Sequence, residues 1–123
     1  MSSIEQLPPR VQQQLARLAQ VQEMLSNIVA RRQQWEAELR EVESAINELN
    51  KVSEDTPVYK SVGMLLIRTD KSSALADLTD KKETIDLRIK TLQRQEGLLK
   101  KQLDDLKKRV SDELSKLRGS SGA

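Results

Sequence analysis

The sequence predicts a mainly α protein, a long antiparallel two-helix coiled coil with a single β-hairpin at the end where the helices connect. Three observations predict this fold class. Apolar residues recur every seven residues in two long stretches, a β-prone segment around Gly63 separates those stretches, and aromatic residues make up only 2% of the composition. With so few rings, the 123 residues lack the bulk for an ordinary globular core, so an extended architecture is expected.

The first segment, residues 1–50, is expected to be the N-terminal coiled-coil helix. Steps of three and four residues from Ile4 to Leu49 meet an apolar side chain everywhere except at Gln14 and Arg32. Such a seam is typical of a coiled coil. Two consecutive prolines begin at Pro8, and proline is tolerated in a first turn, where the missing amide proton costs little. The continuous helix is therefore expected to begin there and to end near Leu49.

Residues 51–72 are expected to form a linker and a β-hairpin. The polar stretch ending in Pro57 breaks the first helix, and two β-prone runs then flank Gly63 and Met64. If these two residues occupy a type II′ turn, Val62 pairs with Leu65 and apolar side chains lie on both faces. The residues expected to mediate assembly are Val58, Tyr59, Val62, Gly63, Leu65, Leu66 and Ile67.

A hairpin of this composition is not expected to stand alone. A two-stranded hairpin is marginally stable in water, and this one would expose apolar residues on both of its faces. The simplest source of further strands is the same hairpin in neighbouring subunits. We therefore expect an oligomer that assembles through the β segments.

Residues 73–118 are expected to form the C-terminal coiled-coil helix, and residues 119–123 a disordered tail. The second seam runs from Leu75 to Leu117 and is interrupted by only three charged residues. Asp70, Ser72 and Ser73 offer N-cap oxygens for this helix. The two seams match in an antiparallel register in which the paired residue numbers sum to 124.

Composition excludes several classes of function. Cysteine and histidine are both absent, so thiolate and imidazole ligands and the commonest general base are missing. Neither catalysis nor a cofactor nor a metal is expected. No apolar run is long enough to cross a membrane, and the N-terminus lacks the pattern of a signal peptide. The protein is therefore expected to be cytoplasmic. Because 21 basic and 19 acidic residues interleave, no nucleic-acid partner is expected either.

Two stretches, PVYKSVGMLLIRTDK at residues 57–71 and LQRQE at residues 92–96, closely resemble the β-type subunits of the prefoldin family. The resemblance covers nearly the whole chain. It implies a jellyfish-shaped hexamer of two α-type and four β-type subunits, in which the hairpins assemble into an oligomeric β-barrel platform. It also implies an ATP-independent molecular chaperone, not an enzyme, whose coiled-coil tips capture unfolded proteins and deliver them to a group II chaperonin. The lack of cysteine and the compact linker suit an archaeal member.

The open end of the helix pair is the predicted client-binding site. Gln14 and Glu113 interrupt the seams there, so the pairing is expected to be loose and apolar side chains to be exposed. Several weak contacts could then act together through avidity. The candidate client-binding residues are Ile4, Leu7, Val11, Leu15, Val110, Leu114 and Leu117. The same residues can instead simply close the coiled coil, and this alternative stays open.

Two other classes of function stay open on the sequence. One is a structural or tethering coiled-coil protein whose helices space a folded partner. The other is a nucleic-acid-binding helical hairpin, against which the interleaved charges argue. The basic residues at 107–109, with Lys116 and Arg118, either meet an acidic chaperonin surface or complement the helix dipole.

Overall fold

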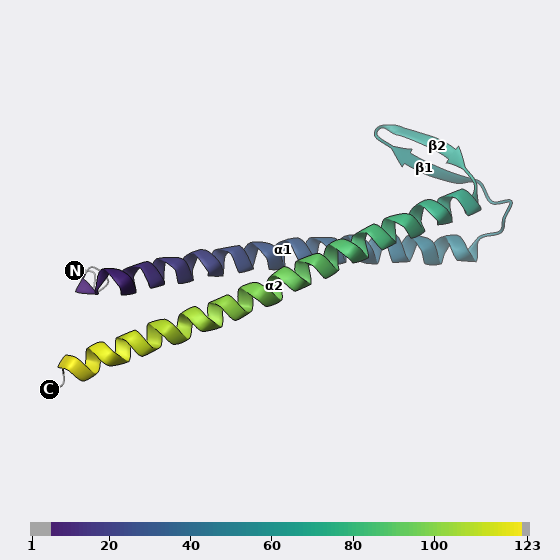
Figure 1. The fold of residues 1–123 in the computed structure, drawn as a ribbon. Helices are drawn as coiled ribbons and strands as arrows, with labels where there is room; N and C mark the ends of the chain where they lie inside the picture. The colour runs from purple at the N-terminus through teal and green to yellow at the C-terminus, as the bar shows by residue number, and fades with distance from the viewer. Residues whose placement is uncertain (1–5, 122–123) are drawn as a thin grey trace. The chain divides into compact units, whose positions relative to one another are not determined.

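The computed structural model describes residues 6–121, which form two helices and two strands (Figure 1). In chain order these are α1 (Pro9–Lys51), β1 (Val58–Val62), β2 (Leu65–Thr69) and α2 (Lys71–Ser121). The predicted fold class is confirmed, since two long helices flank one antiparallel two-stranded hairpin. The contacts divide the chain into two compact units. Unit 1 combines the segments up to Arg31 and from Leu92 onward, and unit 2 is Arg32–Thr91.

Helix α1 begins at Pro9, within one residue of the predicted start. The carbonyl oxygen of Pro8 accepts hydrogen bonds from the backbone N–H groups of Val11 at 2.9 Å and Gln12 at 3.1 Å. The side-chain amide of Gln12 donates to the carbonyl oxygen of Leu7 at 2.7 Å. Proline suits the first helical position because the amide proton it lacks would have had no partner inside the helix.

Helix α1 ends at Lys51, and the next residue closes the last turn. The backbone N–H of Val52 donates to the carbonyl oxygen of Leu49 at 3.3 Å. The carbonyl oxygen of Val52 in turn accepts a hydrogen bond of 2.9 Å from the Nζ of Lys71, the first residue of α2. A basic side chain on a carbonyl near a helix C-terminus satisfies an acceptor that the helix itself leaves open.

The hairpin has the predicted register. Val62 pairs with Leu65 across the turn, and Val58 pairs with Thr69 at the open end. Gly63 has a φ of 57°, and no described residue other than glycine has a positive φ. The turn therefore has a positive φ at its first central residue only, which distinguishes type II′ from type I′.

Helix α2 begins at Lys71, two residues before the predicted start, because Asp70 is the residue that caps it. The Oδ1 atom of Asp70 accepts the backbone N–H of Ser73 at 2.7 Å, and its carbonyl oxygen accepts the backbone N–H of Ala74 at 3.0 Å. The hydroxyl of Ser73 also lies 3.1 Å from Oδ2 of Asp70. This is the geometry of an N-cap aspartate.

Helix α2 continues to Ser121, beyond the predicted end at residue 118. The segment expected to be a tail, residues 119–123, is thus helical as far as Ser121, and its last two residues lie outside the described part. Glycine at position 119 costs a helix only about 1 kcal/mol relative to alanine, and neither glycine nor serine removes the amide that proline would. Arg118 in the last turn complements the negative end of the helix dipole.

Each unit has its own apolar core between a segment of α1 and a segment of α2. The core of unit 1 consists of Val21, Leu99 and Leu103, with Leu18, Leu25, Ile28 and Leu106 packed against it. The core of unit 2 consists of Val42, Ile85 and Ile89, with Trp35, Leu39, Ile46 and Leu78 packed against it. Pairs expected from the antiparallel register, such as Val21 with Leu103 and Trp35 with Ile89, share a core.

Polar contacts at the sides of these cores run in the same antiparallel order. In unit 1, the guanidinium of Arg10 lies 2.7 Å from Oε2 of Glu113. In unit 2, the guanidinium carbon of Arg88 lies 4.7 Å from the centre of the Trp35 ring, close enough for a cation–π contact. Nearby, the Nζ of Lys81 lies 3.3 Å from Oε1 of Glu38.

Candidate functional sites

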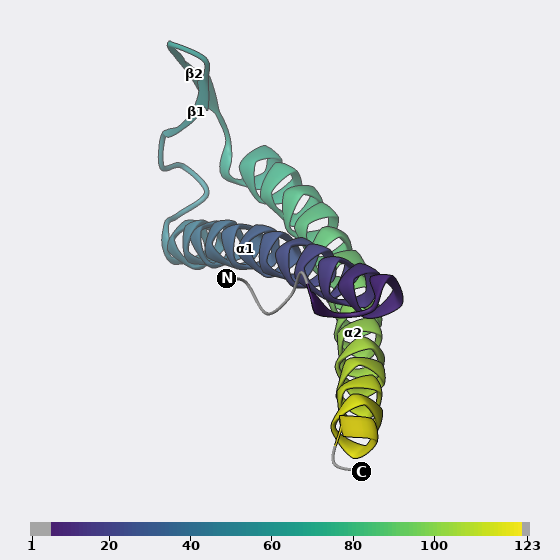
Figure 2. The ribbon, with the colours of Figure 1, turned by 90° about the vertical axis from the view of Figure 1, so that its left-hand side faces the viewer.

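The hairpin carries apolar side chains on both faces, and most of them are exposed. Strand pairing places Val62, Leu65 and Ile67 on one face, and Tyr59 and Leu66 on the other. Ile67 is 48% exposed and Leu66 is 73% exposed. Figures 1 and 2 both show the turn end of the hairpin standing clear of the neighbouring helix segments of unit 2. The predicted assembly residues therefore form a two-sided apolar surface in a sheet that has two open edges among the described residues.

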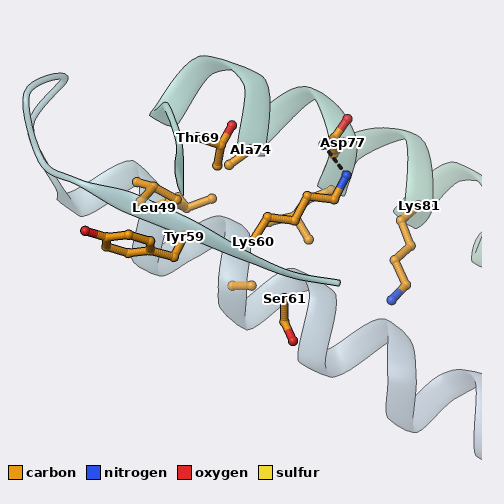
Figure 3. Close-up of a pocket in the computed structure, with 11 residues that line it drawn as sticks. Leu49, Tyr59, Lys60, Ser61, Thr69, Ala74, Asp77 and Lys81 are labelled. Carbon is orange, nitrogen blue, oxygen red and sulfur yellow. Dashed lines mark hydrogen bonds and ion pairs between the residues drawn. The ribbon is translucent and has the colours of Figure 1, made fainter. Parts of the chain in front are cut away.

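The base of the hairpin lies over the last turns of α1 and the first turns of α2, with a pocket of about 440 Å³ between them (Figure 3). Leu49 and Ala74 contribute to the helical side of this pocket. Lys60 reaches across from β1, and its Nζ lies 3.3 Å from Oδ2 of Asp77 on α2. Both side chains of this ion pair are more than half exposed, so it contributes about 0–1 kcal/mol. This ion pair alone therefore holds the hairpin against the helices only weakly.

The predicted client-binding residues come together where α1 begins and α2 ends, but the structure does not leave them open. Val11 is fully buried and Val110 is 7% exposed. Four others are partly exposed: Leu7, Leu15, Leu114 and Leu117. Ile4 lies outside the described residues. The expected loose pairing is not found at the two valines, which could meet a client only if the helix ends separated.

One polar group weakens the packing at this end. The side-chain oxygen of Gln14, a seam position, is buried and accepts no hydrogen bond within the described residues. Leaving a buried acceptor without a partner costs about 1–3 kcal/mol, and opening the helix ends would return that oxygen to water. Gln14 interrupts the seam in the sequence, and the structure buries its side-chain oxygen without a partner among the described residues.

Three large apolar residues on the helices, Met24, Leu87 and Leu98, are exposed and were not predicted as site residues. Met24 and Leu98 lie beside a shallow groove in unit 1. Each directly precedes a seam leucine in the sequence, Leu25 or Leu99. A seven-residue count assigns only one position of such an adjacent pair to the core, so the extra apolar residue next to it is the signal that could have found the groove.

The described residues contain no group of three or more side chains able to hold a metal ion. No helix in this part of the chain is long and apolar enough to cross a membrane. The pKa of Asp70 is lowered, mainly by the backbone N–H of Ser73, which reflects the N-cap.

Comparison with known proteins gives one consistent result. The family model described as "Prefoldin subunit" matches residues 12–116. The prefoldin subunit beta of Pyrobaculum islandicum is 46% identical over 115 residues, which cover 94% of this chain and 92% of the relative. The corresponding protein of Archaeoglobus fulgidus is 44% identical over 110 residues, covering 89% and 95%. The crystal structure of the prefoldin beta subunit from Thermococcus strain KS-1 is similar with a TM-score of 0.81 and 36% identity, covering 85% of this chain and 92% of that one.

Proposed function

Because this chain belongs to the prefoldin family as a β-type subunit, and the family has a chaperone-type role, we propose that it captures unfolded proteins without ATP at its helix ends. It then delivers them to a group II chaperonin. The protein acts by binding in the cytoplasm and not as an enzyme. The observation that carries the proposal is the apolar surface shared by the start of α1 and the end of α2, where a buried and unsatisfied Gln14 lowers the cost of opening.

Assembly is the first step of this function. The two apolar faces and two open edges of the hairpin need further strands to cover them. We place the chain in a hexamer of two α-type and four β-type subunits, with the hairpins as its β-barrel platform. Several helix ends then project from one assembly, so contacts that are weak singly hold an extended client through avidity.

Capture follows from separation of the helix ends. Leu7, Leu114 and Leu117 are already partly exposed, and separation adds the buried side chains of Val11 and Val110. Each apolar side chain that passes from water to a client contributes about 1.5–3 kcal/mol when its burial is complete. The Arg10–Glu113 ion pair holds the ends together only modestly, because the arginine side chain is 70% exposed.

The test is suppression of aggregation by assemblies of equal native mass. A chemically denatured test protein is diluted into buffer without ATP, and light scattering is followed with the intact assembly and with a Leu114→Ser/Leu117→Ser variant. A truncation that removes the segments before Val11 and after Val110 serves as a second variant. We expect both to lose most of the protection. The matched control is Leu87→Ser, which changes an exposed leucine in unit 2.

The alternatives are separated by the same assay. If the intact assembly gives no protection, the chaperone proposal is wrong, and a tether for a folded partner becomes the leading alternative. If both tip variants protect as well as the intact assembly, clients bind elsewhere and the assignment of the helix ends fails. Delivery is tested separately, by transfer of a labelled client from the assembly to a purified group II chaperonin.

A further inference from the structure

A groove in unit 1 is lined by residues that belong neither to the helix ends nor to the hairpin. It runs between residues 17–31 of α1 and residues 95–102 of α2 and has a volume of about 580 Å³. Ile28 and Leu99 contribute apolar surface to it from the seam, and Met24 and Leu98 stand beside them at 41% and 62% exposure. Exposed leucine and methionine side chains in one concave place form a surface that an apolar side chain of another molecule can cover.

The charged groups of this groove are both positive. Arg17 and Arg31 line it, and no aspartate or glutamate does. Arg17 donates one hydrogen bond of 2.8 Å to the side chain of Gln20. Among the described residues, no carboxylate forms an ion pair with either guanidinium. Two arginines without a carboxylate make the groove electrostatically complementary to an acidic ligand.

The groove is large enough to take side chains of an extended segment, since its volume of about 580 Å³ lies within the range of ligand-binding clefts. The side-chain amides of Asn27, Gln95 and Gln102 also line it and can hydrogen-bond the backbone of a bound chain. An unfolded segment offers both an unpaired backbone and accessible apolar side chains.

We propose that this groove binds unfolded client segments that combine leucine-like side chains with carboxylates, and that it directs the assembly towards acidic apolar stretches. The proposal rests on the proposed chaperone function and adds a selectivity to it. Apolar contact with Met24 and Leu98 holds the segment, while Arg17 and Arg31 select its charge. An exposed arginine–carboxylate contact changes affinity about 1.7- to 3.2-fold, and two independent contacts multiply to a preference of about three- to tenfold.

The test uses the full chain in its native assembly and three fluorescein-labelled peptides of twelve residues. The peptides share the same leucines and carry glutamate, glutamine or lysine at the remaining positions. Fluorescence anisotropy gives their dissociation constants at low salt and at about 0.5 M salt, where the Debye length is only a few ångströms. We expect the glutamate peptide to bind three- to tenfold more tightly than the glutamine peptide at low salt, and the difference to shrink at high salt.

Two variants assign this preference to the groove. Arg17→Gln with Arg31→Gln should bring the glutamate peptide to the affinity of the glutamine peptide and leave the glutamine peptide unchanged. Leu98→Ser should weaken all three peptides, whereas the matched control Leu87→Ser should weaken none. Equal affinities of the glutamate and glutamine peptides for the intact assembly, or a preference that survives the double arginine variant, would overturn the proposal.

Other outcomes distinguish the groove from the general function. If Leu98→Ser changes the native mass of the assembly and leaves peptide affinity unchanged, the groove is a contact between copies and the proposal is wrong. If the intact assembly fails to suppress aggregation of any denatured protein but still prefers the glutamate peptide through the two arginines, the chaperone function fails and the groove remains an acidic-peptide site. Circular dichroism verifies that each variant keeps its helices.

Discussion

The hairpin and the helix seams both contain valine, leucine and isoleucine side chains, yet most of these side chains are exposed in the hairpin and buried or partly buried in the seams. Ile85 in the seam of unit 2 is 1% exposed, whereas Ile67 in the hairpin is 48% exposed. The seam finds its partner within the chain because the two helices present complementary seven-residue repeats. The hairpin has no such partner, since a two-stranded sheet leaves its faces and edges uncovered.

The difference shows that apolar content alone does not say whether a segment stabilises the chain or binds another molecule. The role of an apolar segment depends on whether the rest of the chain supplies a complementary apolar surface at the same spacing. Residues in the seam should therefore govern the free energy of unfolding, and residues in the hairpin should govern the state of assembly. The following experiments separate the two roles, in order of decreasing expected effect.

The largest effect is expected from Leu66→Asp combined with Ile67→Asp. Two carboxylates cannot be buried between stacked strands without partners, so assembly should be lost completely while helical content remains. Native mass spectrometry and circular dichroism measure the two properties. A matched control is Leu87→Asp, which places a carboxylate at an exposed leucine of α2. An unchanged native mass in the double variant would show that the hairpin does not mediate assembly.

The next effect is expected from Ile85→Ala in the core of unit 2. Removing a buried isoleucine side chain leaves a cavity, so the free energy of unfolding should fall by about 2–5 kcal/mol. Urea unfolding at a fixed protein concentration, followed by circular dichroism, measures it. The comparison is Ile67→Ala in the hairpin, which should shift assembly more than the unfolding of the helices. Equal losses of helix stability in the two variants would contradict the division of roles.

A pair of glycine substitutions should act with opposite signs. A Cβ atom at Gly63 or at Gly97 would meet no atom within 4 Å, so neither change is opposed by a clash. Gly63→Ala nevertheless forces a side chain into a positive φ and should weaken the hairpin by about 1–2 kcal/mol. Gly97→Ala lies within α2 and should stabilise the helix by about 1 kcal/mol. Thermal unfolding that moves in the same direction for both would count against this account.

Gln14→Leu tests the weakness of the helix ends. Replacing a buried and unsatisfied oxygen with an apolar group should stabilise unit 1 by about 1 kcal/mol and hold the ends together. Hydrogen exchange of the first turns of α1 should slow, and protection of a denatured test protein should decrease. Faster exchange at these amides would contradict the expectation. Gln13→Leu, an exposed neighbour outside the seam, is the control.

The smallest effect is a dependence on pH at the start of α2. The pKa of Asp70 is lowered from its ordinary value of 3.8, chiefly by the backbone N–H of Ser73. Because the folded value is the lower one, the capping contribution is complete above the ordinary value and is lost as the pH falls through the folded value. Asp70→Asn keeps a capping side chain and should remove this part of the acid dependence, as measured by helix content between about pH 5 and pH 2.

Much of the fold could be predicted from the sequence because two patterns, the glycine turn and the seven-residue repeats, restrict how the segments can pair. A glycine between two β-prone runs fixes the turn, and the turn fixes every pair from Val62 and Leu65 to Val58 and Thr69. The seven-residue repeats likewise place Val21 with Leu103 in one core. Both patterns are local or periodic, so a single sequence is enough to find them.

The candidate sites were less predictable because they depend on what remains after packing. The sequence could not show that Val11 and Val110 are buried, since a polar seam residue such as Gln14 can either open a helix pair or be buried at a cost. The seven-residue count assigns Leu99 to the seam and marks Leu98 as an extra apolar residue, but the degree of exposure of Leu98 depends on how the helices pair. The exposure of a side chain depends on how the two helices pair, and the seven-residue repeat of one helix alone does not determine it.

The hydrogen bond from Lys71 to the carbonyl oxygen of Val52 has a consequence for the order in which the chain folds. It joins residues 19 positions apart, whereas the Arg10–Glu113 contact joins residues 103 positions apart. The loop entropy of the longer closure is greater by about 1.5 kcal/mol if nothing between has formed. Pairing should therefore nucleate beside the hairpin and zip towards the termini. During synthesis, Glu113 is added 103 residues after Arg10, so the start of α1 stays unpaired for longer than the helix segments beside the hairpin.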